Sequence, residues 1–140
     1  MCNMHKKFEI EMRKLVMPIL KRARPGDWEH TLRAVNYGKM ILSNEFANFN
    51  IVVPALYLHD TGWSMVDFSE FYEVAPSKRS NTDCFYRHMR FSAEIAAEIL
   101  KRLDFDSKSV EAVVKIVSIH DFPEKRSEEH TSELQSRQSI

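Results

Sequence analysis

Residues 52–63 read VVPALYLHDTGW, and this stretch does most to decide the fold of the 140-residue chain. Its first seven residues are nearly all apolar, so we expect a deeply buried helix over about 52–60. Pro54 suits the first turn of that helix, and Gly62 is expected to stop it. The adjacent pair His59 and Asp60 is thereby placed at the carboxyl end of a buried helix.

Four more helices are predicted around it, because apolar residues recur at spacings of three and four. They cover residues 6–23, 28–44, 85–103 and 107–120. Pro18 should kink or split the first of these, Asp27 should cap the second, and Ser107 should cap the last. No alternating strand pattern competes with them. The predicted fold class is all-α, a helical bundle of about five helices.

The residues expected to face the core share these helical spacings. They are Phe8, Met12, Leu15, Val16, Ile19, Leu20, Leu32, Val35, Met40, Ile41, Ile95, Ile99, Leu103, Val110, Val113, Val114 and Val117. Residues 63–83 lack the pattern and are expected to form a long irregular stretch, of the kind that often serves as a lid or binding loop. Its aromatic residues could stack on a substrate or pack on the bundle; they are Trp63, Phe68, Phe71 and Tyr72.

The composition excludes several classes of protein. Twenty basic residues balance twenty acidic ones, which argues against a mainly electrostatic grip on nucleic acid or on an anionic membrane. Two isolated cysteines, Cys2 and Cys84, fit a reducing compartment, and no apolar run approaches the roughly 20 residues of a membrane span. We therefore expect a cytoplasmic, single-domain protein without nucleic-acid or membrane partners; its oligomeric state stays open.

The carboxyl-terminal segment 126–140 differs in character from the rest of the chain. It has no aromatic residue, and the run RSEEHTSELQS, residues 126–136, matches the in-frame translation of a common sequencing-adapter oligonucleotide. We therefore expect 126–140 to be a non-native or disordered tail. The natural domain is expected over 1–125 and to be incomplete at its carboxyl end.

Four histidines fall at one end of the predicted bundle. They are His30 at the start of the second helix, His59 at the end of the third, His88 at the start of the fourth and His120 at the end of the fifth. Consecutive helices of an up-and-down bundle reverse direction, so these positions meet. Asp60 and Asp121 add two carboxylates. Such a mixture of ligands suits a transition metal better than calcium or magnesium, so the sequence predicts a metal site.

On these residues the chain resembles the HD-domain superfamily of metal-dependent phosphohydrolases. The matches are His30 in DWEHTLRAV, His59 and Asp60 in ALYLHDTGW, His88 in YRHMRFSAEIAAEIL, and His120 in VVKIVSIHD. The resemblance implies an HD-type bundle in which His30, His59 and Asp60 hold a first metal ion, with Asp60 also orienting the attacking water as the catalytic residue. It implies that His88 and His120 serve a second metal ion or the substrate phosphate.

The resemblance also implies the cofactor and the substrate class. One or two divalent ions of Mn, Co, Ni, Fe or Zn would activate water for attack on the phosphate ester of a nucleotide or other small metabolite. Arg33, Arg87 and Arg90 are candidate phosphate-binding residues, because a guanidinium binds phosphate bidentately. Two other functions fit the same pattern: an HD-fold oxygenase with a di-iron pair, and a non-catalytic HD module that binds metal or nucleotide without turnover.

The chain departs from the family pattern in three respects. The distal Asp expected in the helix after His120 is missing where the tail begins, so this chain could be inactive, and Asp121 suits only a supporting role beside the ligands. Trp63 stands where the nucleotidase and alarmone-hydrolase branches have an acid and where the cyclic-dinucleotide phosphodiesterases usually have Lys. The activity class therefore carries over as an expectation, whereas a named substrate does not.

Overall fold

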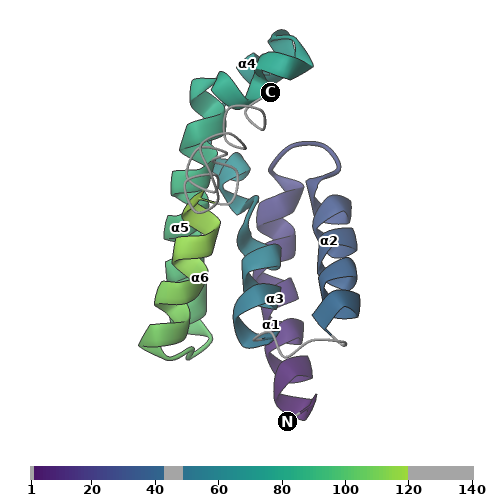
Figure 1. Ribbon diagram of the computed structural model, residues 1–140, viewed down its shortest axis with the longest axis vertical. Helices are drawn as coiled ribbons and strands as arrows, with labels where there is room; N and C mark the ends of the chain where they lie inside the picture. Colours follow the sequence, from purple (N-terminus) through teal and green to yellow (C-terminus); the bar gives the residue numbers. More distant parts are fainter. Residues whose placement is uncertain (1, 43–48, 120–140) are drawn as a thin grey trace, which may run out of the picture.

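The computed structural model describes residues 2–42 and 49–119, and every regular element within them is helical (Figure 1). The long helices are α1 (Cys2–Lys21), α2 (Asp27–Leu42), α3 (Phe49–Leu58), α5 (Asp83–Arg102) and α6 (Ser107–Ile119). Between α3 and α5 lie the 3₁₀ helix η1 (Thr61–Met65), the short helix α4 (Ser69–Glu73) and the 3₁₀ helix η2 (Pro76–Asn81). For the described residues the expected all-α bundle is confirmed.

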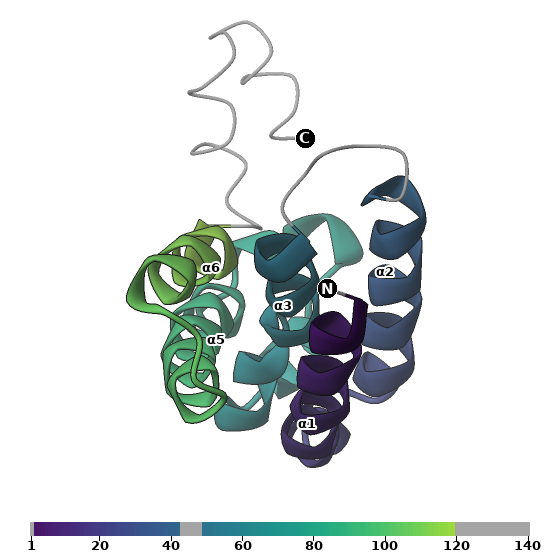
Figure 2. The same ribbon diagram turned by 90° about the horizontal axis from the view of Figure 1, so that it is seen from below.

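Helix α3 lies at the centre of the bundle. It packs between α2 and α6, and α1 crosses beside it, while α5 packs along α6 and against η1 (Figure 2). The large apolar side chains that are fully buried come from every long helix and from η1: Met12, Val16, Leu20, Val35, Val53, Tyr57, Leu58, Trp63, Met89, Leu100, Val113 and Val117. Burying a side chain of this size stabilises the fold by roughly 1.5–3 kcal/mol, so this shared core holds the helices together.

Helix α1 runs without a break through Pro18, so of the two expected effects, a kink or a split, the split is wrong. A proline removes one backbone hydrogen bond, but three turns of α1 are fixed to the core by Met12, Val16 and Leu20. Tertiary packing therefore outweighs the local preference of Pro18 to end a helix.

Helix α2 differs from its prediction at both ends. The Asp27 carboxylate accepts the backbone N–H of Arg24, 2.9 Å away, so it reaches back along the chain instead of capping the turn that follows. Val35 is buried as expected, but Met40 and Ile41 are 66% and 46% exposed. This difference follows from the position of α2 at the edge of the bundle, where only one face meets other helices (Figure 1).

Three further expectations are corrected by the structure. Helix α3 already contains Phe49, so Pro54 lies in its interior, and the helix ends at Leu58, four residues before Gly62. Residues 63–83 are not one irregular stretch, because η1, α4 and η2 occupy most of them. The cap of α6 is Asp106 instead of Ser107, since its carboxylate accepts the backbone N–H of Ser109 at 3.1 Å.

Gly62 is the point where η1 comes closest to α5. Its N–H donates to Ser92 Oγ at 2.7 Å. A methyl group at Gly62 would overlap the carbonyl oxygen of His88 and lie 2.5 Å from the backbone nitrogen of Ser92. The absence of a side chain at this position therefore lets η1 lie directly on the backbone of α5.

A buried polar cluster ties α1 to α2 and α3. The hydroxyl of Tyr57 donates to Glu9 Oε1 at 2.6 Å and accepts from Arg13 Nε at 2.8 Å. Lys39 Nζ pairs with the same oxygen of Glu9 at 2.7 Å. Burial, together with the hydrogen bond to Glu9, raises the pKa of Tyr57 to about 12. Since a buried polar group must be paired, this cluster fixes how α1 sits on the bundle.

Among the described residues, no helix combines the length and the apolar character that crossing a bilayer requires.

We expect Gly62→Ala to destabilise the protein by about 3 kcal/mol or more, because its methyl group would overlap backbone atoms that cannot move aside. Urea unfolding measures this loss. Gly38→Ala is the matched control: its methyl group would meet only the mobile end of the Leu56 side chain, 2.5 Å from Cδ1. Alanine also favours the interior of α2 by about 1 kcal/mol. Wild-type stability in Gly62→Ala would contradict this account of the contact.

The raised pKa of Tyr57 predicts a loss of stability at alkaline pH. Because the folded pKa of about 12 lies above the usual value near 10, the unfolded chain releases this proton first. The contribution is intact below about pH 10 and is lost as the pH rises toward 12, a change of about 2–3 kcal/mol. Urea midpoints between pH 8 and 11.5 should fall accordingly.

The pH dependence assigned to Tyr57 has a matched control. Tyr57→Phe should lose that part of the alkaline fall, and it should be about 1–3 kcal/mol less stable at pH 8 because Glu9 and Arg13 lose a buried partner. Tyr37→Phe removes a hydroxyl from a side chain that is 67% exposed and should keep the full fall. An unchanged alkaline fall in Tyr57→Phe would show that other groups cause it.

Candidate metal centre

Side chains from three separate helical segments meet at one end of the bundle. His30 lies in the first turn of α2, His59 and Asp60 follow the last residue of α3, and His88 lies on α5. The ligand atoms of His30, His59 and Asp60 all lie within 4.8 Å of one another. The expected meeting of these three residues is therefore found in the structure.

His120 and Asp121 lie outside the described residues, so their expected places at the site stay predictions.

Burial divides the cluster into a closed side and an open side. Asp60 is 4% exposed and His88 is fully buried, whereas His59 is half-buried and His30 is exposed. A molecule reaching the cluster from solvent would therefore meet His30 first. The carboxylate of Asp60 forms the floor of the site.

The hydrogen bonds of two histidines fix which ring nitrogen carries a proton. His59 Nδ1 lies 2.7 Å from the carbonyl oxygen of Leu56. His88 Nδ1 is hydrogen-bonded to the carbonyl oxygen of Phe85. A carbonyl only accepts, so each Nδ1 is the donor. In a neutral imidazole this leaves a lone pair on Nε2, the arrangement common in metal-binding histidines.

Both Nε2 atoms face the carboxylate of Asp60. His59 Nε2 lies 3.2 Å from Oδ2, and His88 Nε2 lies 3.5 Å from Oδ1. Two lone pairs would repel each other at such distances, so each of these contacts is favourable only with a positive group between the two atoms. A proton on Nε2, which would make the ring a hydrogen-bond donor to Asp60, fills this role, and a metal ion would replace it.

The charge of Asp60 is maintained by its neighbours. Burial alone would raise the pKa of Asp60, but the hydrogen bonds from His59 and His88 and the charge of Arg24 hold that pKa well below its ordinary value. The carboxylate is therefore ionised at neutral pH. An ionised carboxylate can bind a metal ion without first releasing a proton.

The donor set fits a divalent transition metal. Two imidazole nitrogens and a carboxylate oxygen suit Mn, Fe, Co, Ni or Zn. Ligand bonds of about 2.0–2.2 Å require ligand atoms about 3–3.5 Å apart. His59 Nε2 and Asp60 Oδ2, at 3.2 Å, already meet that requirement, and the exposed ring of His30 has room to approach. The residues present thus fit the metal that the sequence predicts; which metal it is remains a prediction.

A protein-family model described as "HD domain" matches residues 27–139. This range covers most of the chain and includes His30, His59, Asp60 and His88. The chain belongs to the HD domain family. No match was found among curated proteins or among solved structures. The matched range continues past residue 125, and the non-native origin of the tail stays a prediction.

Trp63 forms an inner wall of the HD site. It is 1% exposed, and its ring stacks on the imidazole of His88 with centroids 4.2 Å apart and an interplanar angle of 15°. Phe71 packs edge-on against it at 4.9 Å. Trp63 and Phe71 therefore pack on the bundle, while Tyr72 is 48% exposed.

Arg24 and its partner Asp27 lie beside Asp60, and sequence reasoning did not identify Arg24 as part of the site. Arg24 Nε and Nη2 donate to the two carboxylate oxygens of Asp27, at 3.1 and 3.0 Å. Nη2 also lies 3.5 Å from Asp60 Oδ2. Burial raises the pKa of Asp27, and the hydrogen bonds from Arg24 oppose that rise. The only signal in the sequence was the three-residue spacing of an Arg and an Asp before His30.

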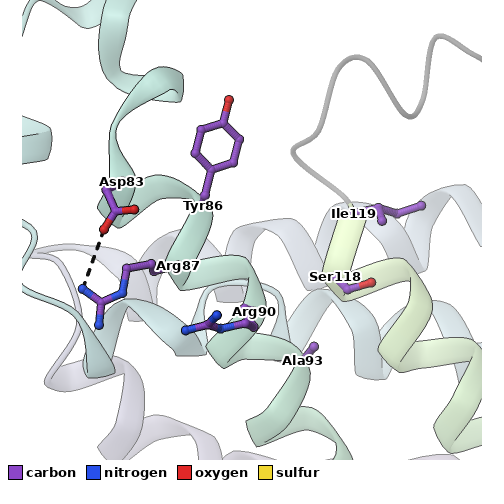
Figure 3. A pocket seen from close by; sticks show the side chains of 7 residues that line it. All are labelled: Asp83, Tyr86, Arg87, Arg90, Ala93, Ser118 and Ile119. Carbon is purple, nitrogen blue, oxygen red and sulfur yellow. Dashed lines mark ion pairs between the residues drawn. The ribbon is translucent and has the colours of Figure 1, made fainter.

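The three candidate phosphate-binding arginines are all exposed. Arg87 and Arg90 line a cavity of about 510 Å³ between α5 and the end of α6, where Arg87 pairs with Asp83 at 3.8 Å (Figure 3). Its other described lining residues are Tyr86, Ala93, Ser118 and Ile119. Arg33 is exposed on α2, one turn after His30. Phosphate binding by these three residues stays a prediction.

We expect Co²⁺ or Mn²⁺ to bind the HD site and to raise the unfolding temperature of the protein. At a free concentration of 100 times the Kd, binding stabilises a folded protein by about 2.7 kcal/mol. Asp60→Asn and His59→Ala should abolish this gain, because each removes a candidate ligand. The control is Asp67→Asn, which changes an exposed carboxylate that contacts Ser69. An equal metal-dependent gain in Asp60→Asn would exclude Asp60 as a ligand.

Proposed function

We propose that this HD domain is a metal-dependent phosphohydrolase that cleaves the phosphate ester of a nucleotide or another small phosphorylated metabolite. The observation that carries the proposal is the position of Asp60. One of its carboxylate oxygens faces His59 and the other faces His88, and His30 lies close by. Membership of the HD family makes this arrangement typical of metal-assisted phosphate chemistry.

His30, His59 and Asp60 would hold the metal ion. A divalent ion bound there would polarise a phosphoryl oxygen and lower the pKa of a bound water. Asp60 is ionised, so it can accept a hydrogen bond from a water and orient it for attack on phosphorus. His88 faces the second oxygen of Asp60 and is the candidate contact for a second ion or for the phosphate.

The surroundings of His59 offer space for the organic part of a substrate. A cavity of about 180 Å³ lies between α3 and α6, with His59 as part of its wall. Its other lining residues are Val52, Ala55, Leu56 and Ile116.

Trp63 occupies the position where the nucleotidase and alarmone-hydrolase branches of the HD family have an acidic residue, and it is buried against His88. The substrates of those branches are therefore not assigned to this chain.

The test is release of inorganic phosphate by the 140-residue chain supplied with Mn²⁺, Co²⁺ or Ni²⁺. p-Nitrophenyl phosphate serves as a general substrate and a panel of nucleoside monophosphates as specific ones. We expect activity that a chelator removes, and a fall in kcat/KM of about 100-fold or more in His59→Ala and Asp60→Asn, because the ion supplies several kcal/mol. Asp67→Asn should keep wild-type activity.

Oxygen consumption and metal binding, measured beside phosphate release, separate the alternatives. Oxygen consumption by iron-loaded protein without phosphate release would indicate an HD-fold oxygenase. Tight metal binding without turnover of any substrate would indicate a binding module, whereas weak metal binding without turnover would indicate a chain that is inactive because the distal Asp is missing. Phosphate release that survives Asp60→Asn would contradict the proposed role of this residue.

A further inference from the structure

Arg24 is held in one orientation by Asp27. The carboxylate of Asp27 accepts the backbone N–H of Arg24 at 2.9 Å and two guanidinium N–H groups at 3.1 and 3.0 Å. The Asp27 side chain is 6% exposed and the Arg24 side chain 18%. A bidentate pair of this kind restricts the guanidinium to one plane. Arg24 is therefore a rigid group on the loop between α1 and α2.

The same guanidinium reaches two residues of the candidate metal centre. Its Nη2 lies 3.5 Å from Asp60 Oδ2, the oxygen that also faces His59. Its Cζ lies 4.3 Å from the ring centre of Trp63, and that ring stacks on His88. One side chain thus contacts the ligand carboxylate directly and supports His88 through a buried ring.

We propose that Arg24 is a positioning residue for the metal centre, which holds the Asp60 carboxylate in the orientation that presents it to the ion. This inference rests on the proposed metal site and assigns it a residue outside the His and Asp pattern. Partners that orient metal ligands typically change metal affinity by 10- to 100-fold when they are removed.

The expected sign separates this role from simple electrostatics. A guanidinium this close to the site repels a divalent cation, so if Arg24 acted only through its charge, its removal would tighten metal binding. If it positions Asp60, its removal should weaken binding, since the carboxylate loses a contact that keeps its orientation. Metal affinity therefore moves in opposite directions under the two roles.

The experiment measures Co²⁺ binding to the full chain by calorimetry, together with the visible absorption of bound Co²⁺, which reports ligand geometry. Arg24→Met should weaken binding by about tenfold or more and alter the spectrum. Arg24→Lys keeps the charge without the planar fork and should bind between the wild type and Arg24→Met. The matched control is Arg22→Met, which removes an exposed side chain that bonds to the Pro18 carbonyl.

The unfolding temperature of each variant is measured first, and Co²⁺ binding is then compared at a temperature where every variant is folded. A loss of stability is thereby not mistaken for a loss of metal affinity. Arg24→Lys, which keeps the charge but loses the planar fork that Asp27 holds, is the second test if Arg24→Met does not fold. Charge alone predicts unchanged Co²⁺ binding in Arg24→Lys, whereas positioning predicts weaker binding. Unchanged or tighter binding in folded Arg24→Met, or in Arg24→Lys where that variant is used, overturns the inference alone. No Co²⁺ binding by the wild type overturns the proposed metal site and this inference with it.

Discussion

The buried charge of Asp60 is the constraint around which the rest of the structure is arranged. An isolated carboxylate that is 4% exposed would be prohibitively costly, so it must be surrounded by groups that can carry a positive charge or donate a hydrogen bond. His59, His88 and Arg24 provide them within 3.2–3.5 Å. They come from the end of α3, from α5 and from the α1–α2 loop. Satisfying one carboxylate thereby fixes three parts of the chain relative to one another.

The backbone contact at Gly62 makes that arrangement possible. Asp60 and Gly62 are two residues apart, and so any movement of η1 away from α5 would also separate Asp60 from His88. The hydrogen bond from Gly62 to Ser92 and the missing side chain let the two segments touch. Trp63 then completes the packing by stacking on His88. A tightly packed interior of this kind holds ligands in place before a metal ion arrives.

Among the described residues, two buried polar networks join helices that are distant in sequence. The first, Glu9 with Tyr57, Arg13 and Lys39, joins α1 to α2 and α3. The second surrounds Asp60 and connects the start of α2 to the end of α3 and to α5. Both networks link helices that are distant in sequence, so each adds specificity to a core that apolar packing alone would leave less defined. Only the second has the ligand chemistry of a metal centre.

The sequence by itself determined the helical class, the core-facing Met12, Val16 and Leu20, and the meeting of His30, His59 and Asp60, since these depend on helical periodicity and the reversal of consecutive helices. Only the tertiary structure decided that α1 continues through Pro18, that Gly62 marks a close contact instead of a helix end, and that residues 63–83 are mostly helical. It also brought Arg24 to Asp60, 36 positions later in the chain. Local patterns report which residues share a face, whereas these features arise from packing between segments far apart in sequence, where burial and pairing outweigh local preference.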